Sequence, residues 1–280
     1  MSVAGGLENA FSAGVAAGCD CLQIFVKNQR QWNAPPLTQE QITRYQEAAS
    51  ATGLAPVIAH ATYLLNLASP KQAMRDKSIR CMIEELTRCE ALGVSGLVFH
   101  PGAHMDDPVE LGIKHIAESL DTVHKACAGF SSMILLETTA GQGSAIGWQL
   151  QQIGDIIDQT KAPDRLGVCL DTCHLFAAGY DFRSREGYDT MTDEMERAFG
   201  IARIKCIHTN DSKKDCGSRV DRHDHIGKGK IGKTGFTHFV NDKRFAGTPM
   251  ILETPKGRDG RGTDLDKVNL KRLRAMIRSR

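Results

Sequence analysis

Residues 166–174 read LGVCLDTCH, and this stretch carries the clearest signature of the fold. Its apolar residues follow one another without strict alternation, which is typical of a strand buried on both faces of a parallel sheet. The run ends at Asp171, and His174 follows three residues later. Both are residue types that bind metal ions. The stretch therefore predicts a buried strand with functional side chains at its carboxyl end.

Six other stretches share this apolar character. They are CLQIFV (21–26), LAPVIAH (54–60), GLVFHPG (96–102), SMILLETT (132–139), IKCIHTND (204–211) and PMILETP (249–255). The clearest helix-like segments are residues 7–17, residues 71–92 with Gly93 as a stop, and residues 107–127. Regular alternation of strand and helix implies a parallel sheet, either doubly wound or closed into a barrel.

A barrel fits the length of the chain best. Seven parallel strands in 280 residues favour an α/β fold of the (β/α)8 TIM-barrel type, as one domain over residues 1–280. The eighth strand should precede the helix expected at residues 7–17, yet residues 1–6 are too few for a strand and a loop. We expect the first strand to be missing or truncated. Either the start is misassigned and the natural chain is longer, which we favour, or the barrel closes imperfectly and is less stable.

The composition narrows the class of protein. The net charge of +2 does not by itself indicate a nucleic-acid binder, but residues 212–235 hold seven Lys and Arg against three Asp. Nine cysteines without a C-x-x-C pair, and no signal sequence, indicate reduced thiols in a cytosol-like compartment. No apolar run is long enough to cross a membrane. We therefore expect a cytoplasmic protein, working at the nucleoid in a bacterium, or a nuclear or mitochondrial one in a eukaryote.

Six of the seven strands end in, or close to, residue types that bind metals. The six are His60, His100, Glu137, Asp171, His208 and Glu253. The carboxyl ends of parallel barrel strands meet on one rim, where barrel enzymes hold their sites, so these side chains should converge. Carboxylates crowded on a rim repel one another, and bound cations remove that penalty. By contrast, we expect His115, His124 and His238 at the surface, because they fall on helix-like stretches.

The loop after the His208 strand adds further candidates. Asp221 and His223 share one side of an extended segment because they are two residues apart. A solvated polar loop explains this motif best when it is taken alone, but its position just beyond a rim strand favours ligation. With His174 the candidates number nine, enough for three metals with bridging carboxylates. Nitrogen and oxygen ligands suit zinc, with manganese or iron as rivals, and such clusters are the usual device for phosphodiester hydrolysis.

Several longer motifs around these residues resemble endonuclease IV, the zinc-dependent apurinic/apyrimidinic endonuclease family. They are His100-Pro-Gly, Glu137 with Thr139-Ala-Gly-Gln-Gly143, Asp171-Thr-Cys-His174-Leu-Phe-Ala-Ala-Gly-Tyr180, His208-Thr-Asn-Asp211, Gly217-Ser-Arg-Val-Asp-Arg-His223 and Ile251-Leu-Glu253-Thr. The similarity runs from Ser2 to about Thr254. Family members normally begin with a strand ending in His-Val-Ser, which is missing here, although none of the nine candidate ligands is lost.

The resemblance implies a base-excision-repair endonuclease with a trinuclear zinc site and three ligand groups. The first ligand group is His60, His100 and Glu137, the second is Asp171, His208 and Glu253, and the third is His174, Asp221 and His223. Glu137 would bridge the first two metals and orient a metal-bridging water, which makes it the predicted catalytic residue. The water would attack the phosphate 5′ to an abasic site in double-stranded DNA and leave a 3′-hydroxyl. Trimming of blocked 3′ ends is a second implied activity.

The resemblance also implies which residues contact DNA. Arg30 in Lys27-Asn-Gln-Arg-Gln-Trp32, and Tyr63-Leu64 after His60, match loops that enter the DNA and hold the abasic sugar out of the stack. Without the family, a helix start packed on the core would be the preferred explanation of Tyr63-Leu64. Arg222 and its basic neighbours suit contacts with backbone phosphates. We expect the protein to act as a monomer.

Two other functions are weighed against this one. A sugar isomerase or epimerase on a similar barrel would also set Glu, Asp and His at strand ends, but it needs fewer ligands and has no use for Asp221-Arg-His223 or residues 28–32. A catalytically inactive DNA-binding relative is the second, and the intact ligand set argues against it. Cleavage of a duplex that carries a stable abasic analogue, with and without chelator, separates the three.

Overall fold

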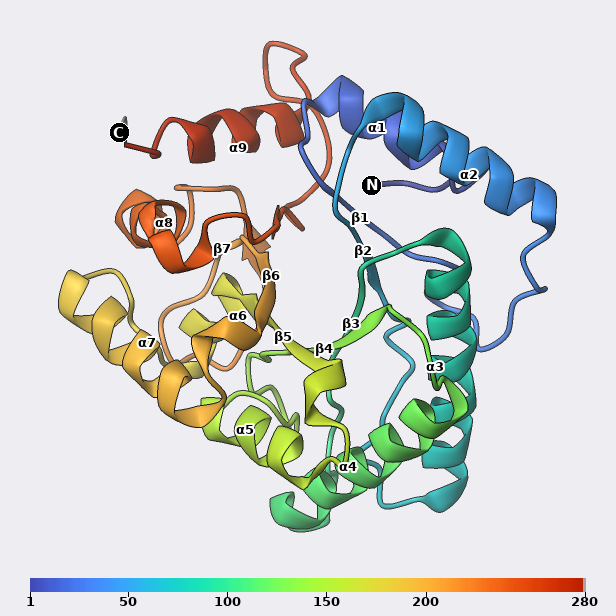
Figure 1. Ribbon diagram of the computed structural model, residues 1–280. Helices are drawn as coiled ribbons and strands as arrows, with labels where there is room; N and C mark the ends of the chain where they lie inside the picture. Colours follow the sequence, from blue (N-terminus) through green and yellow to red (C-terminus); the bar gives the residue numbers. More distant parts are fainter. Residues whose placement is uncertain (279–280) are drawn as a thin grey trace. The chain divides into compact units, whose positions relative to one another are not determined.

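Strands and helices alternate along residues 1–278, the part of the chain that the computed structural model describes (Figure 1). All seven predicted apolar runs contain a strand. The chain divides into two units, Met1–Glu137 with Asp155–Gly167, and Thr138–Gly154 with Val168–Arg280. The expectation of a single domain over residues 1–280 stays a prediction.

The first unit holds four parallel strands that pair in the order of the sequence. They are β1 (Leu22–Ile24), β2 (Val57–His60), β3 (Gly96–Phe99) and β4 (Met133–Glu137). Four helices cover one side of these strands, as the blue-to-green part of Figure 1 shows. They are α1 (Asn9–Ala17), α2 (Gln39–Thr52), α3 (Gln72–Leu92) and α4 (Val109–Ala126). The short helix η1 (Pro163–Arg165) also belongs to this unit, and α5 (Leu150–Gln159) contains residues of both units.

The second unit contains three parallel strands, most of β5 (Leu166–Asp171), then β6 (Ile204–His208) and β9 (Met250–Ile251). A small antiparallel ribbon, β7 (Asp211–Ser212) with β8 (His223–Asp224), follows β6. The helices of this unit are α6 (Thr172–Ala178), α7 (Arg185–Ala198), η2 (Ile201–Arg203), α8 (Gly232–Asn241), η3 (Lys243–Phe245) and α9 (Leu265–Arg274). None of the helices within residues 1–278 combines the length and the apolar character that a membrane crossing needs.

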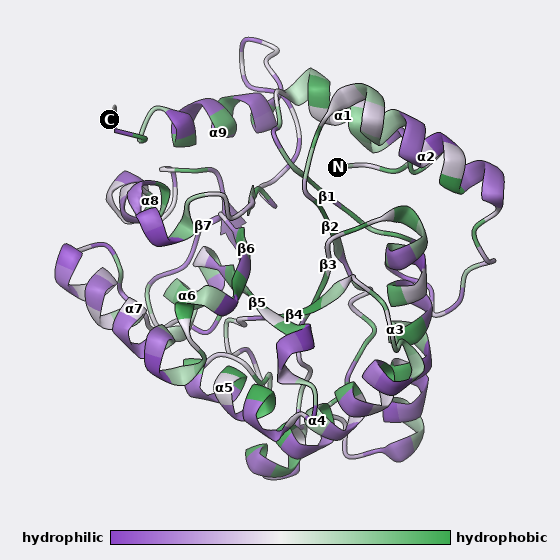
Figure 2. Cartoon of the chain, viewed as in Figure 1, coloured by the Kyte–Doolittle hydropathy of each residue, from purple (hydrophilic) through white to green (hydrophobic). Residues whose placement is uncertain are grey.

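Burial follows the sequence pattern from which the strands were predicted. Every residue of β2, β3 and β5 is buried, so both faces of these strands are covered. The helices are two-faced, and Figure 2 shows hydrophilic and hydrophobic residues side by side along α3 and α4. Helix α3 ends at Leu92 as predicted, because Gly93 adopts a left-handed φ of 73° that residues with a Cβ disfavour.

Two expectations about particular positions have different outcomes. Residues 1–8 contain no strand, as predicted, and the ammonium group of Met1 donates a hydrogen bond to the carbonyl oxygen of Gln23 in β1. The expectation that His124 lies at the surface is wrong. His124 is buried because it follows Leu120 by four residues and so shares the apolar face of α4. This burial lowers the pKa of His124 to about 4.

Candidate metal centre

Parallel register places the predicted ligands level with one another at the strand ends. In the second unit, Asp171 at the end of β5 pairs with His208 at the end of β6. In the first unit, His60 ends β2, Glu137 ends β4, and His100 is the first residue after β3. Each set of strands therefore presents polar side chains at its carboxyl end, where barrel enzymes hold their sites.

The first ligand group is gathered around one carboxylate oxygen. Nε2 of His60 lies 3.0 Å from Oε2 of Glu137, and Nε2 of His100 lies 3.2 Å from the same oxygen. Nδ1 of His60 lies 2.7 Å from the carbonyl oxygen of Ala61, which can only accept a hydrogen bond. Nδ1 therefore carries a proton, and Nε2 faces a carboxylate. A shared cation makes that arrangement favourable.

One of the predicted DNA-contacting residues of the first unit, Tyr63, lies beside this group. Tyr63 is 57% exposed, yet its ring centroid lies 5.0 Å from that of His60 and 5.9 Å from that of His100. Leu64 is half-buried and Arg30 is exposed. An exposed aromatic ring packed against two predicted ligands suits a contact with substrate rather than the core packing that a helix start would show.

The third ligand group surrounds Asp221. Nε2 of His174 lies 3.2 Å from Oδ2 of Asp221, and Nε2 of His223 lies 3.2 Å from Oδ1. Both rings are oriented by backbone carbonyls, because Nδ1 of His174 lies 2.8 Å from the carbonyl oxygen of Thr138, and Nδ1 of His223 lies 3.2 Å from that of Glu253. Donation from Nδ1 again turns Nε2 toward the carboxylate.

The second ligand group shares a residue with the third. Nδ1 of His208 lies 3.1 Å from Oε2 of Glu253 and 3.9 Å from Oδ2 of Asp171. The same Oδ2 lies 3.6 Å from Nε2 of His223. Asp171 thus stands between the two groups of the second unit, which is the position of a carboxylate able to serve two neighbouring cations.

Electrostatics in the third group show how a proton and a metal would compete there. Burial alone would lower the pKa of His223, but the neighbouring Asp171 and Asp221 raise it to about 9. Burial alone would raise the pKa of Asp221, and its contacts with His174 and His223 hold it well below its usual range instead. The site therefore attracts positive charge strongly, whether a proton or a metal ion supplies it.

The donor atoms fit divalent cations with nitrogen and oxygen ligands. Tetrahedral zinc at about 2.0–2.1 Å from its ligands keeps neighbouring ligand atoms about 3.3 Å apart. The closest ligand contacts run from 3.0 Å between His60 and Glu137 to 3.6 Å between His223 and Asp171. Nε2 of His223 is also buried without a partner in hydrogen-bonding geometry among the described residues. A buried ring nitrogen in that state is expected of a metal ligand.

Two residues that hold these ligands in place escaped the sequence interpretation. Oγ1 of Thr138 accepts a 2.9 Å hydrogen bond from the backbone N–H of Asp171, while the Thr138 carbonyl orients His174. The side-chain amide of Asn210 contacts both Asp171 and the backbone of Glu253. Thr138 directly follows Glu137 and Asn210 lies two residues after His208, so their places in the quoted motifs are the one signal that could have found them.

The basic loop, residues 212–235, is organised by a buried carboxylate. Asp211 accepts hydrogen bonds from the backbone N–H groups of Ser212, Gly229 and Ile231 at 2.8, 3.0 and 3.0 Å. Burial raises the pKa of Asp211 although these hydrogen bonds lower it. Arg222 lies exposed on the same loop, where its guanidinium donates to the carbonyl oxygen of Asp221. The loop therefore presents Arg222 next to a predicted ligand.

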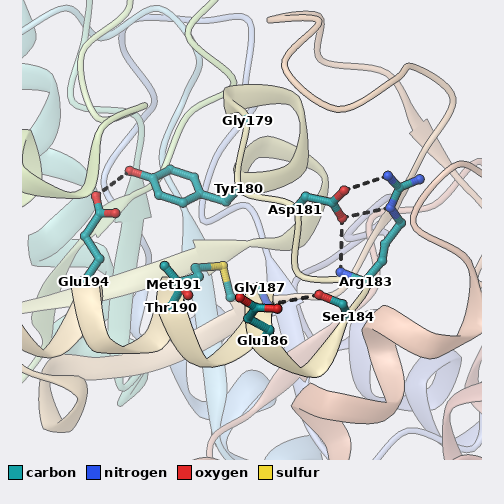
Figure 3. A pocket seen from close by; sticks show the side chains of 10 residues that line it. All are labelled: Gly179, Tyr180, Asp181, Arg183, Ser184, Glu186, Gly187, Thr190, Met191 and Glu194. Carbon is teal, nitrogen blue, oxygen red and sulfur yellow. Dashed lines mark hydrogen bonds and ion pairs between the residues drawn. The ribbon is translucent and has the colours of Figure 1, made fainter.

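A separate open cavity of about 600 Å³ lies between residues 179–184 and α7 (Figure 3). Four of the polar side chains that line it form two pairs. The hydroxyl of Tyr180 donates to Glu194 at 2.8 Å, and Arg183 forms a 2.6 Å ion pair with Asp181. None of the nine predicted ligands lines this cavity. The chemistry of the second unit is therefore expected at the ligand groups and not here.

Comparisons with known proteins concern the fold and the family of the chain. A family model described as a xylose isomerase-like TIM barrel matches residues 11–277. The probable endonuclease 4 of Chloroflexus aurantiacus is 47% identical over 277 residues, which cover 99% of this chain and 96% of the relative. The crystal structure of endonuclease IV from Thermus thermophilus matches with a TM-score of 0.86 at 32% identity, covering 99% of this chain and 96% of that chain.

The same fold also occurs in structures of low sequence identity. A D-tagatose 3-epimerase-like protein matches with a TM-score of 0.74 and covers 97% of this chain and 93% of that chain, but at 17% identity. That likeness concerns the fold alone. The predicted TIM-barrel fold class is confirmed by the family model and by the Thermus structure.

Proposed function

The chain belongs to the endonuclease IV family, and from this membership we propose that it is a metal-dependent base-excision-repair endonuclease. Its substrate would be double-stranded DNA with an abasic site. The observation that carries the proposal is the ligand set, because all nine predicted ligands are present and their donor atoms gather in groups whose spacing suits metal ions. Phosphodiester hydrolysis is the reaction that clustered metals serve best.

We propose one zinc ion for each ligand group, with Glu137 shared between the first and second groups. Manganese or iron are possible substitutes, since the ligands are all nitrogen and oxygen. When bound, the zinc ions would lower the pKa of water and offset the negative charge of the attacked phosphate. All nine ligands come from one chain, which supports a monomer as the active form.

The proposed reaction is hydrolysis of the phosphodiester bond 5′ to the abasic sugar. Glu137 orients the attacking water by accepting a hydrogen bond from it. The oxygen of this water bonds to phosphorus, and the bond from phosphorus to the 3′ oxygen of the preceding nucleotide breaks. A proton then joins that oxygen, so the products are a 3′-hydroxyl and a 5′-phosphate on the abasic sugar. The same attack on a blocked 3′ end would release the blocking group.

Recognition is assigned to the exposed loops. Arg30, Tyr63 and Leu64 would fill the space that the extruded abasic sugar leaves, which costs less than extruding a paired nucleotide because no base has to unstack. Arg222 would contact a backbone phosphate. The position of Tyr63 against His60 supports this division, because the loop residue and the proposed metal ligands would meet the same nucleotide.

The test uses a duplex with a tetrahydrofuran abasic analogue and a matched undamaged duplex. Zinc-loaded protein should nick only the first, 5′ to the analogue, and leave an end that a DNA polymerase extends. Strong chelator should stop the reaction and added zinc should restore it. Folded, zinc-loaded protein that leaves the abasic duplex intact would refute the proposal. Epimerisation of a ketose by the same sample would establish the rival sugar-epimerase function instead.

A further inference from the structure

A buried polar cluster outside the ligand groups connects the two loops proposed to enter the DNA. Its members are Lys27, Thr62 and Glu85, all buried and all in the first unit. We call residues 28–32 the arginine loop and residues 61–65 the tyrosine loop. Lys27 precedes the first loop, Thr62 belongs to the second, and Glu85 lies on α3.

Lys27 binds the end of the arginine loop to α3. Its Nζ donates to the carbonyl oxygen of Trp32 at 2.7 Å and to Sγ of Cys81 at 3.2 Å, and it lies 3.5 Å from Oε1 of Glu85. Burial alone would lower the pKa of Lys27, but the hydrogen bond to Cys81 and the nearby glutamates raise it. The ammonium therefore stays charged and holds the loop closed from residue 27 to residue 32.

Glu85 binds the tyrosine loop to the same helix. Both of its carboxylate oxygens accept from the backbone N–H of Thr62, at 3.3 and 3.2 Å. Glu85 thus contacts Lys27 on one side and the residue before Tyr63 on the other. Burial raises its pKa to about 7 in spite of these contacts.

Thr62 completes the connection between the loops. Its hydroxyl donates to the carbonyl oxygen of Gln29 in the arginine loop. The Oγ1 of this hydroxyl also accepts from the backbone N–H of Leu64 at 3.4 Å. One hydroxyl therefore contacts the residue before Arg30 and the second residue of the Tyr63-Leu64 pair. No member of the cluster is exposed enough to touch DNA itself.

A buried ion pair of this kind is weak evidence of a stability role. The free energy lost when two charges leave water is about as large as the free energy gained from their attraction. Apolar residues of similar volume at such positions often stabilise the fold as well or better. Fixing one arrangement of the neighbouring chain is the better-supported use of such groups. Here the neighbouring chain is the two loops.

We propose that Lys27, Thr62 and Glu85 are positioning residues that set the arginine and tyrosine loops in register with each other before DNA binds. The inference rests on the proposed function, because it assumes that both loops meet the abasic nucleotide. When loops are already ordered before the substrate binds, less conformational entropy is lost on binding, and the affinity is higher. The cluster should therefore increase the preference for abasic over undamaged duplex and contribute little to the chemical step.

The experiment compares Thr62→Val with Thr62→Ser and with Thr160→Val. Valine keeps the shape but removes the hydroxyl, and serine keeps the hydroxyl. Thr160, the residue after α5, is as buried as Thr62, at 4% against 3% exposed, but its hydroxyl bonds back to the carbonyl oxygen of Ile156 in that helix. Each protein is zinc-loaded, and its metal content is measured. Dissociation constants for abasic-analogue and undamaged duplexes are measured on a Glu137→Gln background, and single-turnover nicking rates at saturating DNA are measured with Glu137 intact.

Thr62→Val should weaken binding of the abasic duplex roughly tenfold, the cost of about one buried hydrogen bond with its partner left unsatisfied. Its affinity for undamaged duplex, zinc content and saturating nicking rate should stay near those of Thr160→Val, and Thr62→Ser should restore the preference. Hydrogen exchange at the amides of residues 28–32 should speed up in Thr62→Val, which tests the coupling without DNA.

Unchanged exchange in the arginine loop of folded Thr62→Val would overturn the inference. So would faster exchange with an unchanged preference for abasic duplex. If the parent protein itself showed no preference for abasic duplex, the proposed function would fail and this role in recognition with it. The exchange result would still show whether the loops are coupled, so the two failures are distinguishable.

Discussion

The side-chain amide of Asn210 donates a 2.7 Å hydrogen bond to Oδ2 of Asp171, while its oxygen accepts one of 2.8 Å from the backbone N–H of Glu253. One buried side chain therefore fixes two ligands of the second group at once. Outer partners of this kind set the orientation and basicity of the ligands that they contact.

Replacing this amide should weaken metal binding more than it weakens the fold. We expect Asn210→Ala to lower zinc affinity by about 10- to 100-fold, the usual effect of losing an outer partner. Excess zinc should then restore much of the nicking activity. Titration against a competing chelator measures the change. Asn241→Ala is a suitable control because its side-chain amide contacts backbone groups of Thr237, Met276 and Arg278, none of which is a predicted ligand. Equal zinc affinities in the two variants would contradict the role.

Glu137→Gln should separate catalysis from binding. Glutamine keeps the shape of the side chain but lacks the charge that, in the proposed mechanism, would orient a water and help to hold the metals. We expect nicking to fall by at least about 10²-fold, as for other losses of a group that assists proton transfer, with DNA binding largely kept. Gel-shift and nicking assays on the same abasic duplex measure both. Glu118→Gln, which removes the charge of an exposed glutamate, is the control. Full nicking activity in Glu137→Gln would show that Glu137 has no part in the proposed mechanism.

The raised pKa of His223, about 9 against an ordinary 6.5, predicts opposite effects of pH on the fold and on zinc binding. A group whose folded pKa is raised stabilises the protein fully below its unfolded pKa, and this contribution is lost as pH rises through the folded pKa. The unfolding free energy of chelator-treated protein should therefore fall between pH 6.5 and 9. Zinc affinity should rise over the same range, because zinc displaces the proton.

Urea unfolding and chelator competition at several pH values check both trends. His223→Gln should flatten each of them, since glutamine does not titrate. A metal-free protein that gains stability steadily from pH 6.5 to 9 would show that His223 is not held in its charged form.

Gly229 permits a close approach that no other residue allows. A Cβ at this position would lie 2.3 Å from the carbonyl oxygen of Ser212 and 2.6 Å from Oδ1 of Asp211. Gly229→Ala should cost about 1–3 kcal/mol of unfolding free energy, as overpacking does, and it should weaken DNA binding because the basic loop shifts. Urea unfolding provides the measurement. Gly260→Ala should leave stability nearly unchanged, since nothing lies within 4 Å of its Cβ position.

Arg222→Ala should weaken the binding of abasic and of undamaged duplex DNA to the same extent. A contact with a backbone phosphate does not depend on base sequence or on damage. Its loss reduces the magnitude of the slope of log affinity against log salt concentration by about one. Fluorescence anisotropy at several salt concentrations gives this slope. Arg185→Ala, which removes an exposed arginine paired with Asp189 on α7, should leave the slope unchanged. A change confined to the abasic duplex would assign Arg222 to the lesion instead of the backbone.

The positions of the proposed ligands at the strand ends could be predicted from sequence, because parallel strands align their carboxyl ends whatever their loops do. His60, Glu137 and Asp171 needed only the recognition of an apolar run and its last residue. Thr138 and Asn210 could not be found in this way, since a neutral polar residue beside a ligand has no pattern of its own. Their roles depend on which backbone atom faces which side chain, and that follows from register.

Other features depended on contacts between distant segments. Lys27 and Glu85 are far apart in sequence, and each looks like an ordinary surface charge until α3 packs beneath the arginine loop. His124 was expected at the surface because it falls on a helix-like stretch, but its place on the apolar face of α4 buries it. In both cases tertiary packing decided burial, and the residue type alone was misleading.

Backbone carbonyls orient His60, His174 and His223, and this affects which mutations the candidate metal centre can tolerate during evolution. A backbone oxygen is present whatever amino acid a codon specifies, and it neither ionises nor oxidises. Point mutations at Ala61 or Thr138 can therefore alter the side chain without removing the acceptor. The path of the main chain therefore fixes the tautomer of each histidine. A change of metal preference would require substitution of the proposed ligands themselves, since substitution of Ala61 or Thr138 leaves the carbonyl in place.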